Sequence, residues 1–500
     1  MKYLKLLLLV YVLFTSCKDR IHTEDQSLDL LEKSTKGINI VKKSLELHGH
    51  LTDSLLQIGI AIVAEDGIHR GQSLVSEPPF ERYKLETEFY IDRKNKLEVS
   101  INKNRFAGFD FIYIAVSDQD SVIGYDYNTK TYEKTSSVRF NRFRYFPQSY
   151  LTECLKTPSS ITYDGIVNEQ GIEYQVISSY FNGYKRNLYI DTETGLLNKV
   201  ETLRNYEPYG DGVQTITFSD YLDVKQLKLP TKVSSGGYYG VWEDVVNHFN
   251  IVIKDLDENN IKGHKSMEDY TSSDYSYRLY SEVKKVSNNI YLIENITDSK
   301  SQWSYNILFV ELENSVLVAE APVNNDISKE AIDKIKEVIP NKPIKYLIQS
   351  HHHNDHWGGI REYMSLGVEI ISTPYNSDLL KRIANTPFNL KPDSQSKNNK
   401  IPDIQIVDNE LKISDKNLNI EIYNIGPTDH SNEMLIMYFP NEKVLWQADM
   451  INFGEWSLDN TLKKQLMDKI SALNLEVETI LGLHGKILSD KELNKIIVND

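Results

Sequence analysis

The segment 350–359 constrains the chain more than any other feature, because it gathers four potential metal ligands into one short loop. They form the pattern H-x-H-x-D-H and are His351, His353, Asp355 and His356. Imidazole nitrogens and carboxylates are ligands that Zn²⁺ prefers, and catalytic zinc keeps one position open for water. Residues 344–348 predict a short buried strand before the loop, and the glycine pair at 358–359 leads into a helical pattern. The segment therefore predicts a metal centre at the tip of a strand, where a rigid scaffold holds it.

Three more candidate ligands stand where a strand-like run meets a turn. They are His430, Asp449 and His484, and six of the twelve histidines of the chain fall between residues 351 and 484. His430 follows the apolar run 418–425, and Asp449 ends the run 443–449. A short His-rich tract on a surface can bind metal adventitiously. Ligands at three further strand ends favour a built metal site instead.

These residues resemble the metallo-β-lactamase fold superfamily, whose signature is H-x-H-x-D-H followed by a later His, an Asp and a final His. The resemblance covers roughly residues 283–492 and implies an α/β fold, an αββα sandwich, with two zinc ions per chain. It implies that one zinc is held by His351, His353 and His430, and the second by Asp355, His356 and His484, with Asp449 bridging both. Glu320 stands where the family has an acidic residue, usually Asp, that supports the ligand loop. His352 occupies a variable position of the signature and is not expected to be a ligand.

The resemblance implies metal-dependent hydrolysis of a small molecule. Two metals roughly 3.5–4 Å apart lower the pKa of a shared water and polarise the bond under attack. A metal-bridging hydroxide is then the expected nucleophile, and Asp355 is expected to orient it and to pass a proton to the leaving group. Asp429, beside His430, is a candidate partner for fixing an imidazole tautomer, with an ordinary solvated turn residue as the alternative. The expected substrate carries an ester, lactone, thioester, amide or phosphoester bond.

Other functions stay open at this point. Asp449 occupies the place where the best-known zinc β-lactamases use Cys or Ser, so a β-lactamase-like enzyme is an alternative and not the first expectation. A second alternative is a mononuclear iron dioxygenase of the same fold. A net charge of −15 argues against a nucleic acid partner. The competing class is a lipoprotein that binds an apolar ligand and keeps a structural or relic metal site. Structural zinc sites are usually closed by four protein ligands, and this favours the hydrolase.

The N-terminus, residues 1–17, resembles a bacterial lipoprotein signal. Lys2 and Lys5 precede an apolar run at 6–14 that is too short to span a bilayer, and two small residues then stand before Cys17. We expect lipidation of Cys17 and a protein anchored to a bacterial membrane in the cell envelope, periplasmic or surface-exposed; a plain secretory signal is the alternative. Only one other cysteine exists, Cys154, so a disulfide framework is excluded.

Residues 27–255 predict a separate β-rich α+β domain. A helical pattern at 27–49 is followed by strand-like runs at 84–101, 109–115, 171–180, 185–190 and 196–203. This order resembles the half-barrel of periplasmic lipoprotein carriers, which implies a hydrophobic ligand in a curved sheet. The alternative is that the many aromatic residues simply build a core. The histidines of this domain, His48, His50, His69 and His248, are expected on the surface.

A polar linker at 256–282 separates this domain from the hydrolase domain at 283–500. Helical patterns in the hydrolase domain lie at 328–338, 359–366, 376–384 and 462–473. The polar stretch 391–400 predicts a lid or a flexible surface loop. Candidates for the pocket rim are Trp303, Tyr305, Asn306, Trp357 and Asn432, although packing is the more ordinary role for each. The sequence assigns neither a substrate contact nor an oligomeric state.

Overall fold

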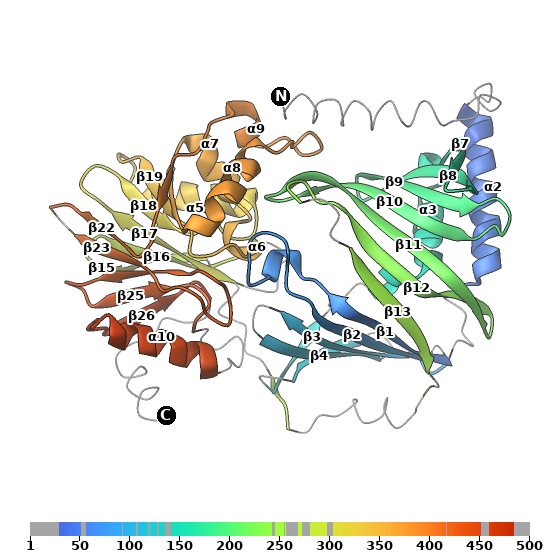
Figure 1. Ribbon diagram of the computed structural model, residues 1–500, viewed down its shortest axis with the longest axis horizontal. Helices are drawn as coiled ribbons and strands as arrows, with labels where there is room; N and C mark the ends of the chain where they lie inside the picture. The colour runs from blue at the N-terminus through green and yellow to red at the C-terminus, as the bar shows by residue number, and fades with distance from the viewer. Residues whose placement is uncertain are drawn as a thin grey trace.

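A computed structural model describes residues 30–51, 57–92, 94–106, 109–118, 121–127, 130–135, 142–242, 246–254, 256, 269–272, 281–297, 304–416, 418–451 and 460–484. The expected signal segment and Cys17 lie outside these residues. Figure 1 shows two lobes, one built on a large sheet in the N-terminal half and one layered lobe in the C-terminal half. Within the described ranges, no helix is both long and apolar enough to cross a membrane.

The N-terminal lobe is built on one sheet of 14 strands, with the order β14-β6-β5-β4-β3-β2-β1-β13-β12-β11-β10-β9-β8-β7. Its strand pairs are antiparallel, apart from the parallel pair of β14 and β6. The strands are β1 (Gln57–Gly67), β2 (Tyr83–Asp92), β3 (Leu97–Phe106), β4 (Phe109–Asp118), β5 (Ser121–Asp126), β6 (Thr131–Thr135), β7 (Thr162–Glu169), β8 (Ile172–Phe181), β9 (Tyr184–Asp191), β10 (Leu197–Tyr206), β11 (Gly210–Val224), β12 (Leu227–Tyr238), β13 (Asn247–Lys254) and β14 (Thr271–Ser272). The strand-like runs expected at 171–180 and 185–190 correspond to β8 and β9, which form an antiparallel pair.

Two helices cover part of this sheet. α2 (Leu30–His48) and α3 (Pro147–Lys156) pack on each other, and they contact β7 and β8 respectively. Val41 and Leu45 of α2 and Leu151 of α3 are buried in one core with residues of the sheet. The pattern at 27–49 therefore does form a helix, and its apolar face is what holds it on the sheet.

Four histidines of the N-terminal lobe are expected on the surface, but two of them, His48 and His69, are at least half-buried. His48 is fully buried, and its Nε2 accepts a hydrogen bond of 3.0 Å from the Leu197 amide. His69 is half-buried and its ring stacks on Tyr83 with 5.8 Å between centroids. His50 and His248 are exposed as expected. Polar neighbours in the sequence suggested exposure, but contacts distant in the chain decide the burial of a polar side chain.

The C-terminal lobe has four layers, helix, sheet, sheet and helix, as the αββα expectation requires (Figure 1). The first sheet has seven strands in sequence order: β15 (Glu282–Ser287), β16 (Ile290–Ile296), β17 (Tyr305–Glu311), β18 (Val316–Ala319), β19 (Ile344–Ile348), β20 (Glu369–Ser372) and β21 (Ile404–Ile406). The second has five: β22 (Glu410–Ser414), β23 (Asn419–Asn424), β24 (Leu435–Phe439), β25 (Val444–Gln447) and β26 (Thr479–Gly482). The helices are α5 (Asn325–Val338), α6 (Asn354–Trp357), α7 (Ile360–Leu366), α8 (Ser377–Asn385), α9 (Ser394–Asn398) and α10 (Asn460–Ala472).

Alternate residues of the strands explain the layering. In β17, Leu308 and Val310 face the core between the two sheets, whereas Ile307 and Phe309 face the core beneath α5, α7 and α8. A strand buried on both faces reads as a continuous apolar run, and this is how 307–310 reads in the sequence. α10 covers the outer face of the second sheet through Leu462 and its neighbours.

The polar stretch 391–400 is not a loose loop, because part of it is helical. It contains α9, which Asp393 anchors to α7 by a buried ion pair with Arg361 at 2.6 Å. Burial alone would raise the pKa of the Asp393 carboxyl. The Arg361 guanidinium and hydrogen bonds from Ser396 outweigh this effect and lower the pKa to about 2. A charged stretch of sequence can therefore be well ordered when one of its charges pairs with a buried residue of opposite charge.

The expected linker lies largely outside the described residues. Where it is described, Thr271 and Ser272 pair with β6 of the N-terminal sheet, and the first strand of the C-terminal lobe begins at Glu282. The change from one lobe to the other therefore falls between Ser272 and Glu282.

Candidate metal centre

The H-x-H-x-D-H loop joins the end of β19 to α6 and α7. The glycine pair at 358–359 is required by close packing, because a Cβ atom on Gly358 would collide with the Val323 carbonyl, and one on Gly359 with Ser328 and Asn324. This close approach ties the loop to the segment that leads into α5. The ligand loop is therefore held by neighbouring backbone on its C-terminal side.

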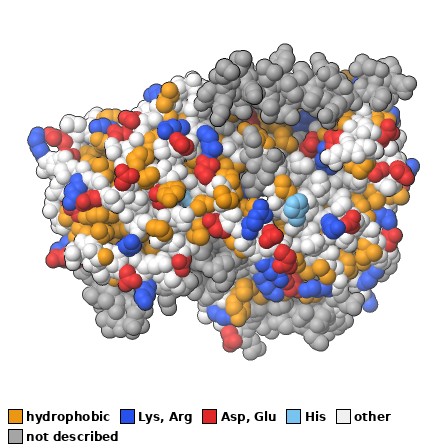
Figure 2. Space-filling model, in the orientation of Figure 1, with side chains coloured by type: hydrophobic (Ala, Val, Ile, Leu, Met, Phe, Trp, Pro, Cys, Tyr) orange, Lys and Arg blue, Asp and Glu red, His pale blue; other side chains and the backbone are white. Residues whose placement is uncertain are grey.

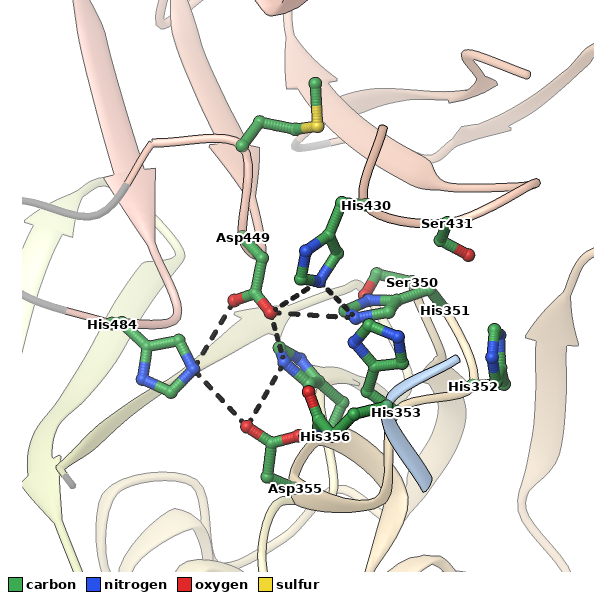
Figure 3. Close-up of polar contacts among 12 residues, drawn as sticks. Ser350, His351, His352, His353, Asp355, His356, His430, Ser431, Asp449 and His484 are labelled. Atoms are coloured by element: carbon green, nitrogen blue, oxygen red, sulfur yellow. Dashed lines mark hydrogen bonds and ion pairs between the residues drawn. The ribbon is translucent and has the colours of Figure 1, made fainter. Parts of the chain in front are cut away.

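The other candidate ligands reach the same place from the second sheet. His430 lies in the loop between β23 and β24, Asp449 follows β25, and His484 follows β26. The structure brings all seven predicted ligand residues together at one edge of the sandwich (Figure 3). The five imidazoles among them are at most 2% exposed.

Four residues form the first potential metal site: His351, His353, His430 and Asp449, each with one ligand atom within 4.8 Å of the others. The Nε2 atoms of His351 and His430 are 3.2 Å apart. Asp449 Oδ2 lies 3.0 Å from His430 Nε2 and 3.6 Å from His351 Nε2. Three imidazoles and one carboxylate oxygen thus converge on one point.

Asp355, His356 and His484 form the second potential site. Asp355 Oδ2 lies 3.6 Å from His356 Nε2 and 3.8 Å from His484 Nε2. Asp449 faces this site too, since its Oδ1 lies 3.4 Å from His484 Nε2 and its Oδ2 lies 2.8 Å from His356 Nε2. The carboxylate of Asp449 therefore stands between the two sites, where a bridging ligand is expected. A third group of potential ligands is Glu320 with His351 and His356, whose ligand atoms also lie within 4.8 Å of one another.

The donor set fits metal ions. Asp449 Oδ1 and His353 Nδ1 are buried and have no hydrogen-bond partner among the described residues. Leaving buried acceptors without a partner costs free energy, and a bound cation would satisfy both. Imidazole and carboxylate together are zinc ligands, with no thiolate needed.

Burial and mutual repulsion keep two of these imidazoles, those of His351 and His353, neutral. Burial, with the neighbouring histidines, holds the pKa values of His351 and His353 well below their usual range. Burial also disfavours the charged form of His356, but Asp449, Asp355 and Glu320 outweigh it and raise its pKa. Burial opposes ionisation of Asp449, yet His356 and His484 hold its pKa well below the usual value. Neutral imidazole and ionised carboxylate are the forms that bind metal.

Hydrogen bonds behind the ligands orient the rings. Glu320 is fully buried; its Oε2 lies 2.7 Å from His356 Nδ1, and its Oε1 accepts from the Ser350 amide at 2.6 Å. Ser350 Oγ lies 2.8 Å from His351 Nδ1, and the Ser304 carbonyl 3.3 Å from His484 Nδ1. Glu320 thus has the supporting contacts that the resemblance implied.

Asp429 has no such contact with the ring of His430 among the described residues. Asp429 is exposed, and its amide donates to Gln465 at 3.2 Å. The alternative interpretation of Asp429, an ordinary solvated turn residue, is the one that the structure favours.

Of the candidate rim residues, Trp303 lies outside the described residues. Tyr305 is buried with its ring 4.7 Å from that of His484, and the Asn306 side chain donates to the Gly482 carbonyl at 3.1 Å. Trp357 is fully buried and donates to Tyr209 at 3.1 Å. These described aromatic and amide side chains support the fold around the ligands.

The loop between β1 and β2, residues 68–82, reaches the centre from the N-terminal lobe. It includes the short helix η2 (Arg70–Gln72), and Figure 1 shows it extending from the N-terminal sheet toward α6. Gln72 Nε2 donates to Asp355 Oδ1 at 2.6 Å, and the Ser73 carbonyl lies 3.0 Å from His353 Nε2. These residues could not be predicted from the sequence, because they stand some 280 positions from their partners and carry no ligand pattern.

Comparison with known proteins identifies this lobe. The family model for the metallo-beta-lactamase superfamily matches residues 303–380, which include the H-x-H-x-D-H loop. The C-terminal region is a metallo-beta-lactamase superfamily domain. A curated relative of this domain, Metallo-beta-lactamase type 2 of Elizabethkingia meningoseptica, is 24% identical over 179 residues, which are 35% of this chain and 63% of the relative. The chain therefore spans less than two thirds of the length of that relative.

Solved structures similar to the metallo-beta-lactamase domain include two beta-lactamases. One is a metallo-beta-lactamase from Pontibacter korlensis, with 15% identity and a TM-score of 0.34 over 44% of this chain and 100% of that chain. Another is the DIM-1 metallo-beta-lactamase, with 19% identity and a TM-score of 0.33 over 43% of this chain and 94% of that chain.

Proposed function

We propose that the chain is a dinuclear zinc hydrolase that cleaves an ester, lactone, thioester or amide bond of a small molecule. The observation that carries the proposal is the placement of Asp449 between two groups of potential ligands, one of three histidines and one of Asp355, His356 and His484. Two zinc ions held there would lower the pKa of a shared water toward neutrality and polarise the bond under attack. The match to the metallo-beta-lactamase superfamily supports hydrolase activity in general.

The residues of the chain divide the work between binding and proton transfer. Asp355 is the most exposed of the seven ligands, with 26% of its side chain accessible, so it can contact both water and substrate. We assign to Asp355 the orientation of the attacking water and the transfer of its proton to the leaving group. The buried imidazoles hold the site in place, because their rings are packed against one another.

A structural or relic metal site is the competing interpretation. A structural zinc site is usually closed by four protein ligands. Here the two groups contain no thiolate and share the carboxylate of Asp449, and Asp355 of the second group is partly accessible to solvent, unlike a ligand of a closed structural site. The hydrolase is therefore the better supported of the two functions, and a β-lactam belongs among the candidate substrates because the curated relative is named a metallo-beta-lactamase.

We further propose that Cys17 is lipidated and that the enzyme acts on a small molecule at a bacterial membrane in the cell envelope, without a nucleic acid partner. The N-terminal lobe would then present a hydrophobic substrate from its curved sheet. Support comes from the signal-like residues before Cys17 and from the net charge of −15, which disfavours a polyanion.

The proposal is tested with a panel of ester, lactone, thioester, amide and β-lactam substrates, offered to the zinc-loaded chain and to its Asp449→Ala variant. We expect turnover of at least one class by the unaltered chain. The variant should lose at least about a hundredfold in kcat/KM, since removal of the shared ligand disrupts both metal sites. Turnover that survives in the variant undiminished would show that the mechanism is wrong.

A further inference from the structure

We propose that the β1–β2 loop of the N-terminal lobe is a built part of the metal centre, in which Gln72 and the Ser73 carbonyl position two ligands of the metallo-beta-lactamase domain. The inference rests on the metal-binding part of the function proposed above, and it extends the centre to a segment outside the family match at 303–380. A pale blue length of ribbon from the N-terminal half passes beside His353 in Figure 3.

The Ser73 carbonyl determines which nitrogen of His353 is free for a metal. His353 Nε2 lies 3.0 Å from the Ser73 oxygen, and a carbonyl oxygen only accepts hydrogen bonds. Nε2 must therefore carry the proton, and Nδ1 keeps its lone pair. Nδ1 is the buried atom that has no hydrogen-bond partner among the described residues. The N-terminal lobe thus supplies to His353 the support that a metal-bound histidine needs.

The same carbonyl explains His352, which the ligand pattern leaves without a role. His352 Nε2 lies 2.7 Å from the Ser73 oxygen, and the side chain is buried. Because a carbonyl oxygen only accepts hydrogen bonds, His352 Nε2 is the donor in this contact. It belongs to no potential metal group among the described residues. His352 therefore holds the β1–β2 loop on the ligand loop.

Gln72 acts on the second site. Its Nε2 donates to Asp355 Oδ1 at 2.6 Å and to Asn354 Oδ1 at 3.0 Å. Asp355 Oδ2, the other oxygen, is the one near His356 and His484. The amide of Gln72 therefore fixes the carboxylate so that Oδ2 points into the second site.

Contacts on both sides hold the loop in this position. Glu81 accepts hydrogen bonds from the Ser73 hydroxyl and, at 2.9 Å, from the Leu74 amide. The Leu74 carbonyl accepts from the Asn432 amide at 2.8 Å, next to the ligand-bearing turn of His430. At Gly71 a Cβ atom would lie 2.9 Å from the Asn354 side chain, so the loop lies directly on α6. The loop is thus braced internally by Glu81 and held by two ligand segments of the other lobe.

The test measures metal affinity of the full-length chain by competition with a chelator, and the absorption spectrum of the cobalt-loaded protein. Gln72→Ala removes the hydrogen bond to Asp355, and Glu81→Ala releases the backbone that presents the Ser73 carbonyl. We expect each variant to bind metal about 10- to 100-fold more weakly, as when other hydrogen-bond partners of ligands are lost. We also expect a changed cobalt spectrum, because the ligand geometry itself changes.

Glu77→Ala is the matched control, since Glu77 lies on the same loop and its ion pair is with Arg382 of α8. It should leave the metal affinity and the cobalt spectrum unchanged. If Gln72→Ala and Glu81→Ala behave like this control, the proposal is wrong, even where zinc hydrolysis is found. If Glu81→Ala does not fold, Gln72→Ala decides alone. If the unaltered chain binds no metal, the proposed function and this inference both fail.

Discussion

At the scale of single residues, the candidate metal ligands differ in the group that contacts the second nitrogen of each imidazole ring. His356 is backed by a buried carboxylate, His351 by a hydroxyl, and His484 by a backbone carbonyl. A carboxylate or carbonyl forces the facing ring nitrogen to be the donor, whereas a hydroxyl can donate or accept. The tautomer of His356 therefore depends on Glu320 more strictly than that of His351 depends on Ser350.

Glu320→Gln should weaken metal binding although it conserves the shape of the side chain. The Ser350 amide would still hold the Gln oxygen, so the Gln amide would face His356 Nδ1 as a donor. This contact favours the wrong tautomer of His356 and places a proton on the nitrogen near Asp449. We expect a loss of about 10- to 100-fold in metal affinity, measured by chelator competition.

The control for this change is Glu313→Gln, because Glu313 forms an ion pair with Lys416 on the surface, where both side chains are accessible. That variant should bind metal as the unaltered chain does. Unchanged affinity in Glu320→Gln would contradict the role given to Glu320.

The clustering of the seven candidate ligands could be predicted from the sequence because side-chain chemistry and short spacing carry the signal. Four of the seven lie within six residues, and the others each follow an apolar run. The groups that orient the ligands carry much less signal. The carbonyl of Ser73 is chemically the same as any other backbone carbonyl, so only the fold shows that it lies beside His353.

At the scale of elements, periodicity predicted the helices of the C-terminal lobe well. α5, α7, α8 and α10 fall within a few residues of the expected ranges, because the apolar residues of each helix pack into a core beside a sheet. The flexible loop expected at 391–400 is wrong, because a buried pair, Arg361 with Asp393, anchors the short helix in this stretch. Hydrophobic patterns do not report such a pair. The same limit explains why His48, at the end of α2, was placed on the surface.

The buried His48 should make the N-terminal lobe sensitive to acid. Burial lowers the pKa of His48 to about 4, whereas a histidine in the unfolded chain titrates near 6.5. The neutral ring therefore contributes fully to stability above about pH 6.5, and this contribution is lost as the pH falls toward 4. Between about pH 7.5 and 5.5 the expected loss from this group is about 1.3 kcal/mol of unfolding free energy.

Urea unfolding at both pH values checks this, with His48→Gln as the comparison. Glutamine can still accept from the Leu197 amide, which now donates to the His48 ring at 3.0 Å, but it does not titrate. The variant should lose less stability between the two pH values than the unaltered chain. Equal losses in the two proteins would contradict the prediction.

At the scale of the whole molecule, the two lobes meet at the metal centre. The β1–β2 loop, Tyr209 and Trp242 of the N-terminal lobe contact the lobe that carries the ligands. Trp242 and Tyr209 share one core with residues beneath α5 and α7, so this contact is apolar as well as polar. The sequence predicted two parts joined by a linker, but contacts between parts distant in the chain could not be read from composition.

Charge at this scale agrees with a small substrate. Asp and Glu side chains alternate with Lys and Arg over the face shown in Figure 2, while the chain as a whole carries a net charge of −15. A polyanion partner would need a basic surface, which the overall charge does not favour.

The measurement that tests the dinuclear centre most directly is elemental analysis of the full-length chain, after loading with zinc and removal of the excess. We predict about two zinc ions per chain, one for the His351, His353 and His430 group and one for the Asp355, His356 and His484 group. A single bound ion, or none, would contradict the dinuclear hydrolase.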